Sequence, residues 1–194
     1  MVAGILSNLR NTVIVAFVFT LVVFVVVTGG QTNEGFAAFV FRWLHVVSGI
    51  MWVGLLWYFN FVQIPSMPKI PDEQKPAISK VIAPEALFWF RWAAMATIIT
   101  GLILAMLSGY LIDSILLGTQ DGSGRIIGIG MWLGAIMWFN VWFVIWPNQK
   151  RALGLVETTP ELKAASARTA MLFSRTNTTL SVPMLFCMVA QQSL

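Results

Sequence analysis

The run "FAAFVFRWLHVVSGIMWVGLLWYFNFV", residues 36–62, contains one charged residue, Arg42, and the only histidine of the chain, His45. A helix needs roughly 20 consecutive apolar residues to cross a bilayer, and this run is longer than that. The segment therefore predicts a membrane-spanning helix that carries a single imidazole inside its apolar length.

The composition of the whole chain agrees with a membrane protein. Of 194 residues, 58% are hydrophobic and 10% are charged, whereas a soluble domain has roughly 25% charged residues. The net charge of +4 comes from basic residues in short loops between apolar blocks, so we expect no nucleic-acid partner. The single cysteine, Cys187, excludes an intrachain disulfide, and no C-x-x-C-H motif for covalent haem is present.

Five apolar or partly apolar blocks predict five spans of an all-α integral membrane bundle. The spans lie at about 12–28, 36–62, 86–112, 126–146 and 170–190 of a single domain, 1–194. We expect the first to be an uncleaved helix that faces lipid. The fifth contains "SRTNTTLS" (174–181) and Pro183, so we expect it to be buried against other helices and to continue a surface helix that starts after Pro160. No internal repeat is evident.

The connections predict loop structure and orientation. The stretch 64–84 holds five of the eight prolines and predicts an extended, turn-rich surface loop, and 113–124 predicts a glycine-rich turn. Ten of the twelve basic residues fall on one side of the predicted spans. The positive-inside rule then places the N-terminus in the cytoplasm and the C-terminus in the periplasm, for a multi-pass protein of the bacterial inner membrane.

His45 is the first candidate for a functional residue. Ionisable side chains at this depth in a bilayer are rare and mark functional sites by default. Arg42 and Gly49 share its helix face, at i−3 and i+4. Such a glycine leaves a flat recess for the macrocycle of a haem b with His45 as iron ligand, and Arg42 suits a haem propionate.

Residues of the fourth predicted span complete this haem hypothesis. Gly130 and Gly134 lie on one face at a depth similar to that of His45, and Met131 or Met106 is a candidate thioether ligand. The alternative is a neutral imidazole bonded to a backbone carbonyl or hydroxyl, with glycines serving close helix packing. A proton relay or a quinone contact is a third interpretation.

A second polar group of residues lies toward the inner leaflet. Its members are Asn60, Gln63, Glu85, Arg91, Asn140, Arg175 and Asn177. Four of them, Asn60, Asn140, Arg175 and Asn177, are candidate catalytic residues in a shared pocket for an anionic small molecule or a quinone headgroup. The alternative is that the arginines extend to the headgroups and the asparagines form hydrogen bonds between helices.

Four motifs in order carry a family resemblance. They are "LHVVSGIMWVGLLWYFNFVQIPSMP", "IAPEALFWFRWAAMATIITGL", "IGIGMWLGAIMWFNVWFVIWPNQK" and "ARTAMLFSRTNTTLSVPMLFCMVA". Over about residues 36–190 the chain resembles the membrane domain of bacterial membrane-bound urate hydroxylases, the urate oxidase N-terminal family. More distantly, a histidine followed by a Trp-Val-Gly step resembles copper-resistance D-type proteins and the membrane protoporphyrinogen oxidase, which are associated with haem.

The resemblance implies urate oxidation at the membrane, with electrons passed to a cytochrome c domain fused at the C-terminus. This chain ends at "MVAQQSL" without such a domain, so we expect a separate cytochrome c or a larger membrane complex as partner. Two hypotheses follow: a haem b redox protein that hands electrons to an external cytochrome c, and a non-catalytic accessory subunit. The bilayer and further copies of the chain are the other expected partners.

Overall fold

The computed structural model describes residues 2–119 and 124–191, and these ranges contain helices and no strand. The chain forms two compact units, residues 1–39 and 40–194. The first unit contains α1 (Val2–Leu6), α2 (Leu9–Thr28) and the first turn of α3 (Phe36–Trp57). The all-α prediction is confirmed for the described residues.

Helix α2 has none of its residues buried within the structure. Its first turn is capped by Asn8, whose side chain accepts a hydrogen bond from the backbone of Asn11 at 3.4 Å, and it ends at Gly29 with φ +64°. Glycine is favoured there because a left-handed backbone suits a residue without Cβ. An apolar helix exposed on all sides fits the predicted lipid-facing span.

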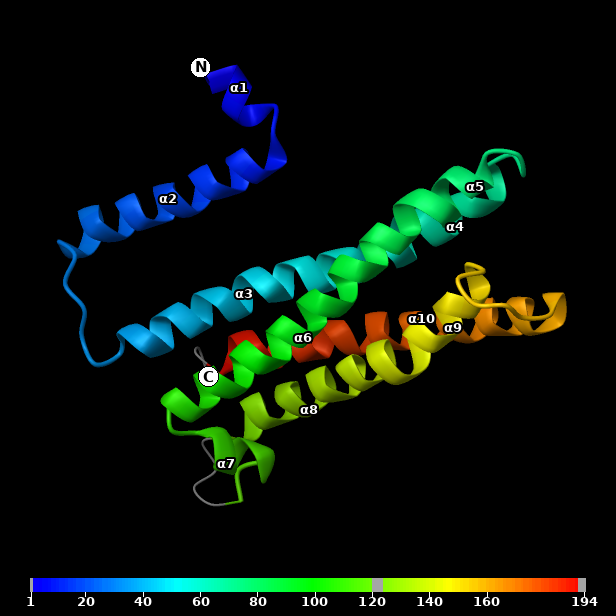
Figure 1. Cartoon of the computed structure of the whole chain (residues 1–194). Coiled ribbons are helices and arrows are strands. Elements are labelled where there is room, and N and C mark those ends of the chain that lie inside the picture. The colour runs from blue at the N-terminus through cyan, green and yellow to red at the C-terminus, as the bar shows by residue number, and fades with distance from the viewer. Residues whose placement is uncertain (1, 120–123, 192–194) are drawn as a thin grey trace. The chain divides into compact units, whose positions relative to one another are not determined.

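The second unit consists of four long helical segments and one short helix. These are α3 with η1 (Tyr58–Gln63), α4 (Ile64–Ser66) and η2 (Met67–Lys69); α5 (Lys75–Ala77), η3 (Ile78–Ile82) and α6 (Ala83–Leu107); α7 (Leu111–Ile115); α8 (Arg125–Phe139), η4 (Asn140–Ile145) and α9 (Trp146–Ala152); and α10 (Pro160–Ala190). Figure 1 shows α3 and α8 running in one direction and α6 and α10 in the opposite direction.

The core of this unit is built by all four long helices. Its buried side chains include Trp52 and Leu56 of α3, Phe90 and Ala94 of α6, Met137 of α8, Val141 of η4 and Met184 of α10. The core is thus that of a four-helix bundle, in which each helix presents one stripe to the centre.

Within the described residues, four helices are long and apolar enough to cross a membrane: Leu9–Thr28, Phe36–Lys69, Lys75–Leu107 and Arg125–Ala152. Span three was expected to end at residue 112, but its helix ends at Leu107, because Gly109 turns the chain with φ +78°. The fifth predicted span lies within α10, which is helical throughout but is not one of the four helices that meet the criterion.

The expectation of an extended loop over 64–84 is wrong, because helix continues to Lys69 and resumes at Lys75. Proline lacks an N–H, and its ring clashes with the carbonyl four residues earlier in an α-helix. The π segments avoid this clash. The residues before Pro65, Pro84 and Pro147 donate their N–H five residues back, so the helix is wider at each proline.

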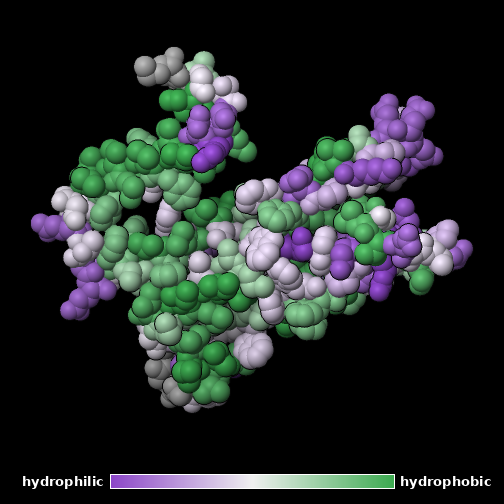
Figure 2. Space-filling view, in the orientation of Figure 1, coloured by the Kyte–Doolittle hydropathy of each residue, from purple (hydrophilic) through white to green (hydrophobic). Residues whose placement is uncertain are grey.

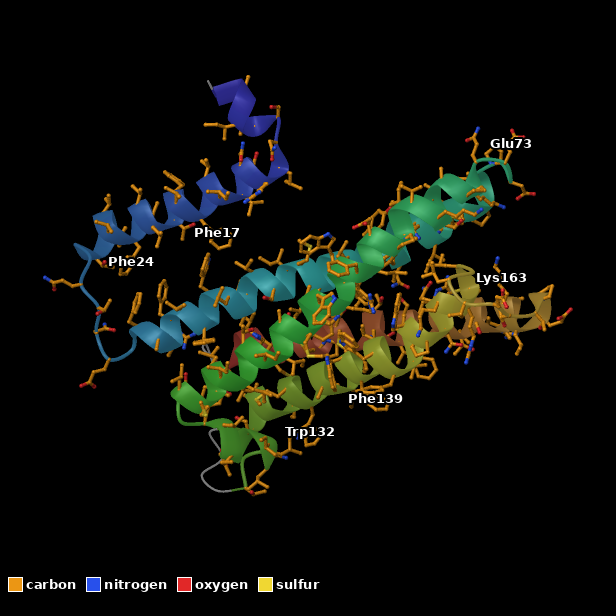
Figure 3. All side chains as sticks on the ribbon, viewed as in Figure 1. Phe17, Phe24, Glu73, Trp132, Phe139 and Lys163 are labelled. Atoms are coloured by element: carbon orange, nitrogen blue, oxygen red, sulfur yellow. The ribbon has the colours of Figure 1, made fainter. Side chains whose placement is uncertain are left out.

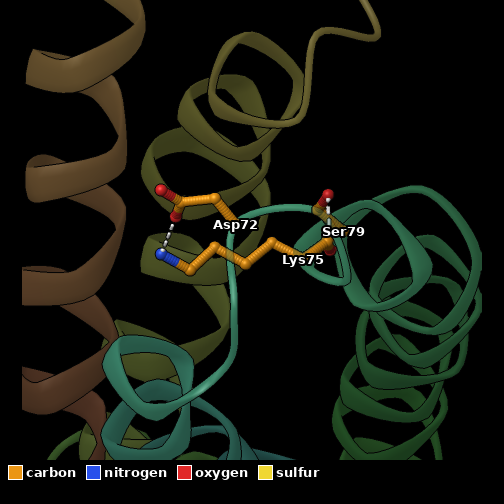
Figure 4. Close-up of polar contacts among 3 residues, drawn as sticks. All are labelled: Asp72, Lys75 and Ser79. Carbon is orange, nitrogen blue, oxygen red and sulfur yellow. Dashed lines mark hydrogen bonds and ion pairs between the residues drawn. The ribbon is translucent and has the colours of Figure 1, made fainter.

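The short connection between these two helices is held by local polar contacts, shown in Figure 4. Lys75 Nζ lies 2.6 Å from a carboxylate oxygen of Asp72, and the hydroxyl of Ser79 donates to the carbonyl of Lys75 at 3.2 Å. The hydrogen bond from Lys75, together with its charge, lowers the pKa of Asp72. Figure 2 shows hydrophilic residues gathered at this end of the unit, over the 64–84 connection, α9 and the start of α10.

The predicted turn over 113–124 is partly helical, because α7 occupies its first residues. Asp113, which is buried, accepts a hydrogen bond from the backbone of Gly124 at 2.7 Å, next to the start of α8. Gly128 is required one turn further on, since a Cβ there would lie 2.2 Å from the carbonyl oxygen of Ser114. Residues 120–123 lie outside the described part of the chain.

Candidate functional site

His45 is held by α6 through its ring nitrogen. Nδ1 of His45 lies 2.9 Å from the backbone carbonyl oxygen of Thr97. A carbonyl oxygen only accepts, so Nδ1 carries the proton and Nε2 keeps its lone pair. The contact therefore fixes both the tautomer and the orientation of the imidazole.

Gly101 forms the surface on which this ring lies. A Cβ at position 101 would be 2.8 Å from Cε1 and 2.9 Å from Nδ1 of His45, which is closer than real Cβ atoms approach. Thr97 and Gly101 are one helical turn apart, so α6 presents a carbonyl and a gap on the same face. Sequence reasoning missed both residues, because a backbone carbonyl and a missing side chain leave no chemical signature in one sequence.

Two further residues of the predicted haem site lie on α3 near His45. Gly49 is half-buried, and a Cβ there would meet Cγ2 of Thr97 at 3.9 Å, an ordinary contact. Arg42 is exposed. Its charge acts on Tyr110, just beyond the end of α6: burial raises the pKa of the Tyr110 phenol, and Arg42 lowers it by a smaller amount. Arg42 therefore lies at the end of the bundle where α6 ends.

The residues of α8 assigned to the haem recess are not brought together with His45 by any described contact. Gly130 faces α10, where a Cβ would lie 2.9 Å from Cβ of Cys187. Gly134 is buried, yet a Cβ there would meet nothing within 4 Å. Met131 is half-buried on the same helix. Gly130 thus has the geometry of a helix-packing glycine.

The inner polar residues form a network centred on α10. Nδ2 of Asn140 donates to Oδ1 of Asn177 at 2.8 Å, and Nδ2 of Asn177 donates to the carbonyl of Met137 at 2.9 Å. Asn177 is fully buried. A buried amide requires such partners, because an unpaired one loses its hydration without compensation.

A second pair of contacts joins α3 to the same stripe of α10. Nδ2 of Asn60 donates to the hydroxyl of Ser174 at 2.8 Å, and Nε1 of Trp57 donates to the hydroxyl of Ser181 at 3.0 Å. Ser174, Asn177 and Ser181 follow one another at helical spacing on the buried side of α10. The prediction that the most polar segment is buried against other helices is confirmed.

Not all of the predicted polar residues join this network. Arg175 and Glu85 are exposed, and Arg91 contacts Trp146 instead. Gln63 is half-buried, and its Oε1, like Oδ1 of Asn60, has no donor among the described residues. The structure thus brings together three of the four candidate catalytic residues, Asn60, Asn140 and Asn177, around one side of α10.

A short repeat, which the expectation of no internal repeat overlooked, relates α3 to α8. "MWVGLLWYFN" (51–60) and "MWLGAIMWFN" (131–140) share Met, Trp, Gly, Phe and Asn at the same positions. The two copies bury opposite faces. Trp52 is 1% exposed and Trp132 49%, while Phe59 is 7% exposed and Phe139 52%. Figure 3 shows Trp132 and Phe139 on the side of α8 away from α6.

Together these features define a helical membrane protein in which one half-buried histidine and an asparagine network lie between the helices of a bundle. The family comparison agrees with this class. Residues 117–192 match the model of the urate oxidase N-terminal family, the family that the four motifs resemble. No curated protein and no solved structure matches the chain. The matched range contains Asn140 and Asn177, whereas His45 precedes it.

Proposed function

We propose that this chain is the membrane module of a redox protein related to urate hydroxylase, and that it binds haem b through Nε2 of His45. The observation that carries the proposal is the contact between Nδ1 of His45 and the carbonyl of Thr97. Histidines that ligate metals usually donate their other ring N–H to a carbonyl or carboxylate, which fixes the tautomer and raises ligand basicity.

The residues around His45 fit one side of such a group. Gly101 leaves room on α6 for the Cε1–Nδ1 edge of the ring, and Gly49 keeps the neighbouring turn of α3 without a side chain. The exposed guanidinium of Arg42, one turn away, is the partner for a propionate. Met131 of α8 is the candidate for a second ligand, a thioether, although no described contact joins it to His45. Gly130 and Gly134 lie on α8, where Gly130 serves packing against α10.

A bound haem would supply one-electron transfer, and the protein residues would hold and orient it. In our proposal α10 completes a five-span topology with the N-terminus in the cytoplasm and the C-terminus in the periplasm of a bacterial inner membrane. His45 then lies in the outer leaflet, within reach of an external cytochrome c. We do not extend the proposal to catalysis by Asn140 and Asn177, since these two amides bond to each other.

The absorption spectrum of the purified full chain, expressed with added haem precursor, tests this function. We expect a Soret band that shifts on reduction with dithionite, and its loss in His45→Ala. Arg42→Gln should keep the band but release haem more easily. Gly54→Ala is the matched control on α3, because a Cβ there meets nothing within 4 Å. A wild-type chain without a Soret band, or a His45→Ala variant with an undiminished one, would overturn the proposal.

A second function, an accessory subunit of a larger membrane complex, is favoured by the amide network. Asn140 and Asn177 use their side chains for contacts between helices. Such contacts are structural and call for no ligand. Native gels of gently solubilised membranes separate the two functions: migration only as a free monomer or homo-oligomer rejects the accessory subunit.

A further inference from the structure

Arg91 and Lys150 converge on the indole of Trp146. The guanidinium carbon of Arg91 lies 3.4 Å from the ring centroid of Trp146. Nζ of Lys150 lies 5.7 Å from the ring centroid of Trp146. A guanidinium stacks well on an aromatic face because it is planar and weakly hydrated. Two like charges thus approach one indole from two different helical segments, α6 and α9.

The donors of this pair are largely unused within the protein. Nε of Arg91 donates to the carbonyl of Leu87 at 3.3 Å, and no other hydrogen bond of its side chain occurs among the described residues. The one ion pair of the described part of the chain joins Asp72 to Lys75, so neither Arg91 nor Lys150 has a carboxylate partner there. The remaining N–H groups are free to bind an anion.

The surroundings place this pair at a membrane interface. Trp89 and Trp92, which flank Arg91 on α6, are exposed, and the ring of Trp92 meets that of Trp142 at 5.5 Å. Indole rings exposed on the outside of membrane helices gather at the level of the lipid headgroups. The same end of the unit carries the hydrophilic surface of Figure 2.

We propose that Arg91 and Lys150, held by Trp146, form a binding site for the phosphodiester of an anionic phospholipid headgroup. A guanidinium binds phosphate oxygens with two parallel hydrogen bonds, and an ammonium adds a point charge. Basic pockets between membrane helices are known to bind such headgroups. This site is separate from His45, and lipid binding there does not depend on haem binding.

Native mass spectrometry of the full chain in detergent tests the site, with dioleoyl phosphatidylglycerol and dioleoyl phosphatidylcholine as probes. We expect selective retention of phosphatidylglycerol, and an affinity about fivefold lower in Arg91→Gln and in Lys150→Gln, since each basic residue near an anionic surface contributes about 1 kcal/mol. Trp146→Leu should weaken binding without removing a charge. The matched control is Arg175→Gln on α10, which removes an exposed guanidinium without a ring contact.

Three outcomes would overturn the assignment. Equal retention of both lipids would remove the anionic preference. Equal losses in Arg175→Gln and Arg91→Gln would reduce the site to general surface charge. Inorganic phosphate that displaces the lipid at equal concentration would make a soluble anion the ligand in place of a lipid. Thermal unfolding of each variant shows whether it is folded, and Lys150→Gln, which leaves the Arg91–Trp146 stack in place, keeps the test valid if Arg91→Gln unfolds.

Discussion

Helices α3 and α8, with the π segments η1 and η4 that follow them, share five of ten residues in one motif and bury opposite faces of it. In α3 the aromatic face of the motif points into the bundle core, whereas in α8 the equivalent Trp132 and Phe139 point outward. In water such a reversal would be very unfavourable. In a bilayer it costs little, because lipid tails are as apolar as a protein interior. The apolar residues of the motif therefore do not decide which face is buried.

The last residue of the motif behaves the same way in both copies. Asn60 and Asn140 each donate a hydrogen bond to a buried side chain of α10, Ser174 and Asn177 respectively, one turn apart. An amide has few partners in hydrocarbon, so its bonds fix the rotation of a helix where apolar contacts leave it free. We infer that polar contacts set the rotation of α3 and α8, with α10 as their common partner.

Asn177→Leu is expected to have the largest effect among the changes that test whether contacts with α10 set the rotation of α3 and α8. The change leaves Nδ2 of Asn140 without its acceptor and removes the side-chain donor to the carbonyl of Met137, which keeps the backbone N–H of Asn140. We expect the free energy of unfolding to fall by about 2 kcal/mol, since one hydrogen bond between membrane helices contributes roughly 0.6–1.7 kcal/mol. Unfolding by sodium dodecyl sulfate in mixed micelles measures it.

The control for this change is Thr179→Val, an exposed residue of α10 whose hydroxyl bonds only to the carbonyl of Arg175 in its own helix. Its effect should stay below about 0.5 kcal/mol. The double variant Asn140→Leu/Asn177→Leu should lose less than the sum of the single changes, because it leaves no lone amide. Additive losses would show that the two asparagines act separately.

Gly101→Ala tests the contact that joins α3 to α6. The added Cβ would meet the ring of His45 at 2.8 Å, so the imidazole must leave its place on Thr97. We expect a loss of about 1–2 kcal/mol, as is typical of inserting a methyl group into a packed site. The same micelle unfolding experiment applies, and the control Gly54→Ala should be neutral or stabilising, because it has open space and replaces a poor helix former.

Adding His45→Ala to Gly101→Ala removes the clash, and it should recover most of the lost stability. If the double variant is as unstable as the sum of its parts, the ring does not rest on Gly101, and α3 and α6 are held by other contacts. That result would also weaken the haem proposal, since the orientation of Nε2 of His45 depends on the contact of its ring with Gly101.

Sequence could predict the all-helical class, four of the spans and the buried polar side of α10. The length of an apolar segment indicates whether it spans a bilayer, and polar residues within it indicate a side that contacts protein and not lipid. The π segments could not. Proline-rich stretches such as 64–84 are typical of loops in water, and only the wider turns before Pro65 and Pro84 keep them helical. The haem, the five-span topology and the outer cytochrome c stay predictions.

Sequence reasoning found His45, Asn60, Asn140 and Asn177 because polar groups are rare in apolar segments. It did not find Thr97 or Gly101, since a backbone carbonyl and a missing side chain leave no chemical signature in one sequence. Residue type alone also did not show that Arg175 is exposed, because helix rotation follows from the contacts of its neighbours.

Trp57→Phe tests a weaker contact between α3 and α10. Trp57 is equivalent to Met137 in the repeat, and its Nε1 donates to the hydroxyl of Ser181 on α10. Loss of this bond should lower the free energy of unfolding by about 0.5–1 kcal/mol. Trp132→Phe is the control, because the bond from Trp132 to the carbonyl of Ile115 is exposed. Equal effects of both changes would contradict a special role for the α3–α10 contact.

The smallest expected effect concerns the start of α10, the helix that both copies of the motif contact. Thr159 caps it, accepting from the backbone of Leu162 at 3.3 Å, and Glu161 lies in its first turn. The backbone N–H of Glu161 itself, and then the hydroxyl of Thr159, lower the pKa of the Glu161 carboxyl. An acid whose pKa is lowered by folding stabilises the folded state when ionised.

The stabilisation by Glu161 is therefore present above its ordinary pKa and is lost as the pH falls through the lowered value. We expect Glu161→Gln to be slightly less stable than wild type at pH 7, and the difference to shrink as the pH falls through the lowered pKa of Glu161, in thermal unfolding followed by circular dichroism. The exposed Glu157→Gln, before the cap, is the control and should change neither the stability nor its pH dependence. A difference that does not shrink as the pH falls would mean that packing, and not the charge at the helix start, explains the effect.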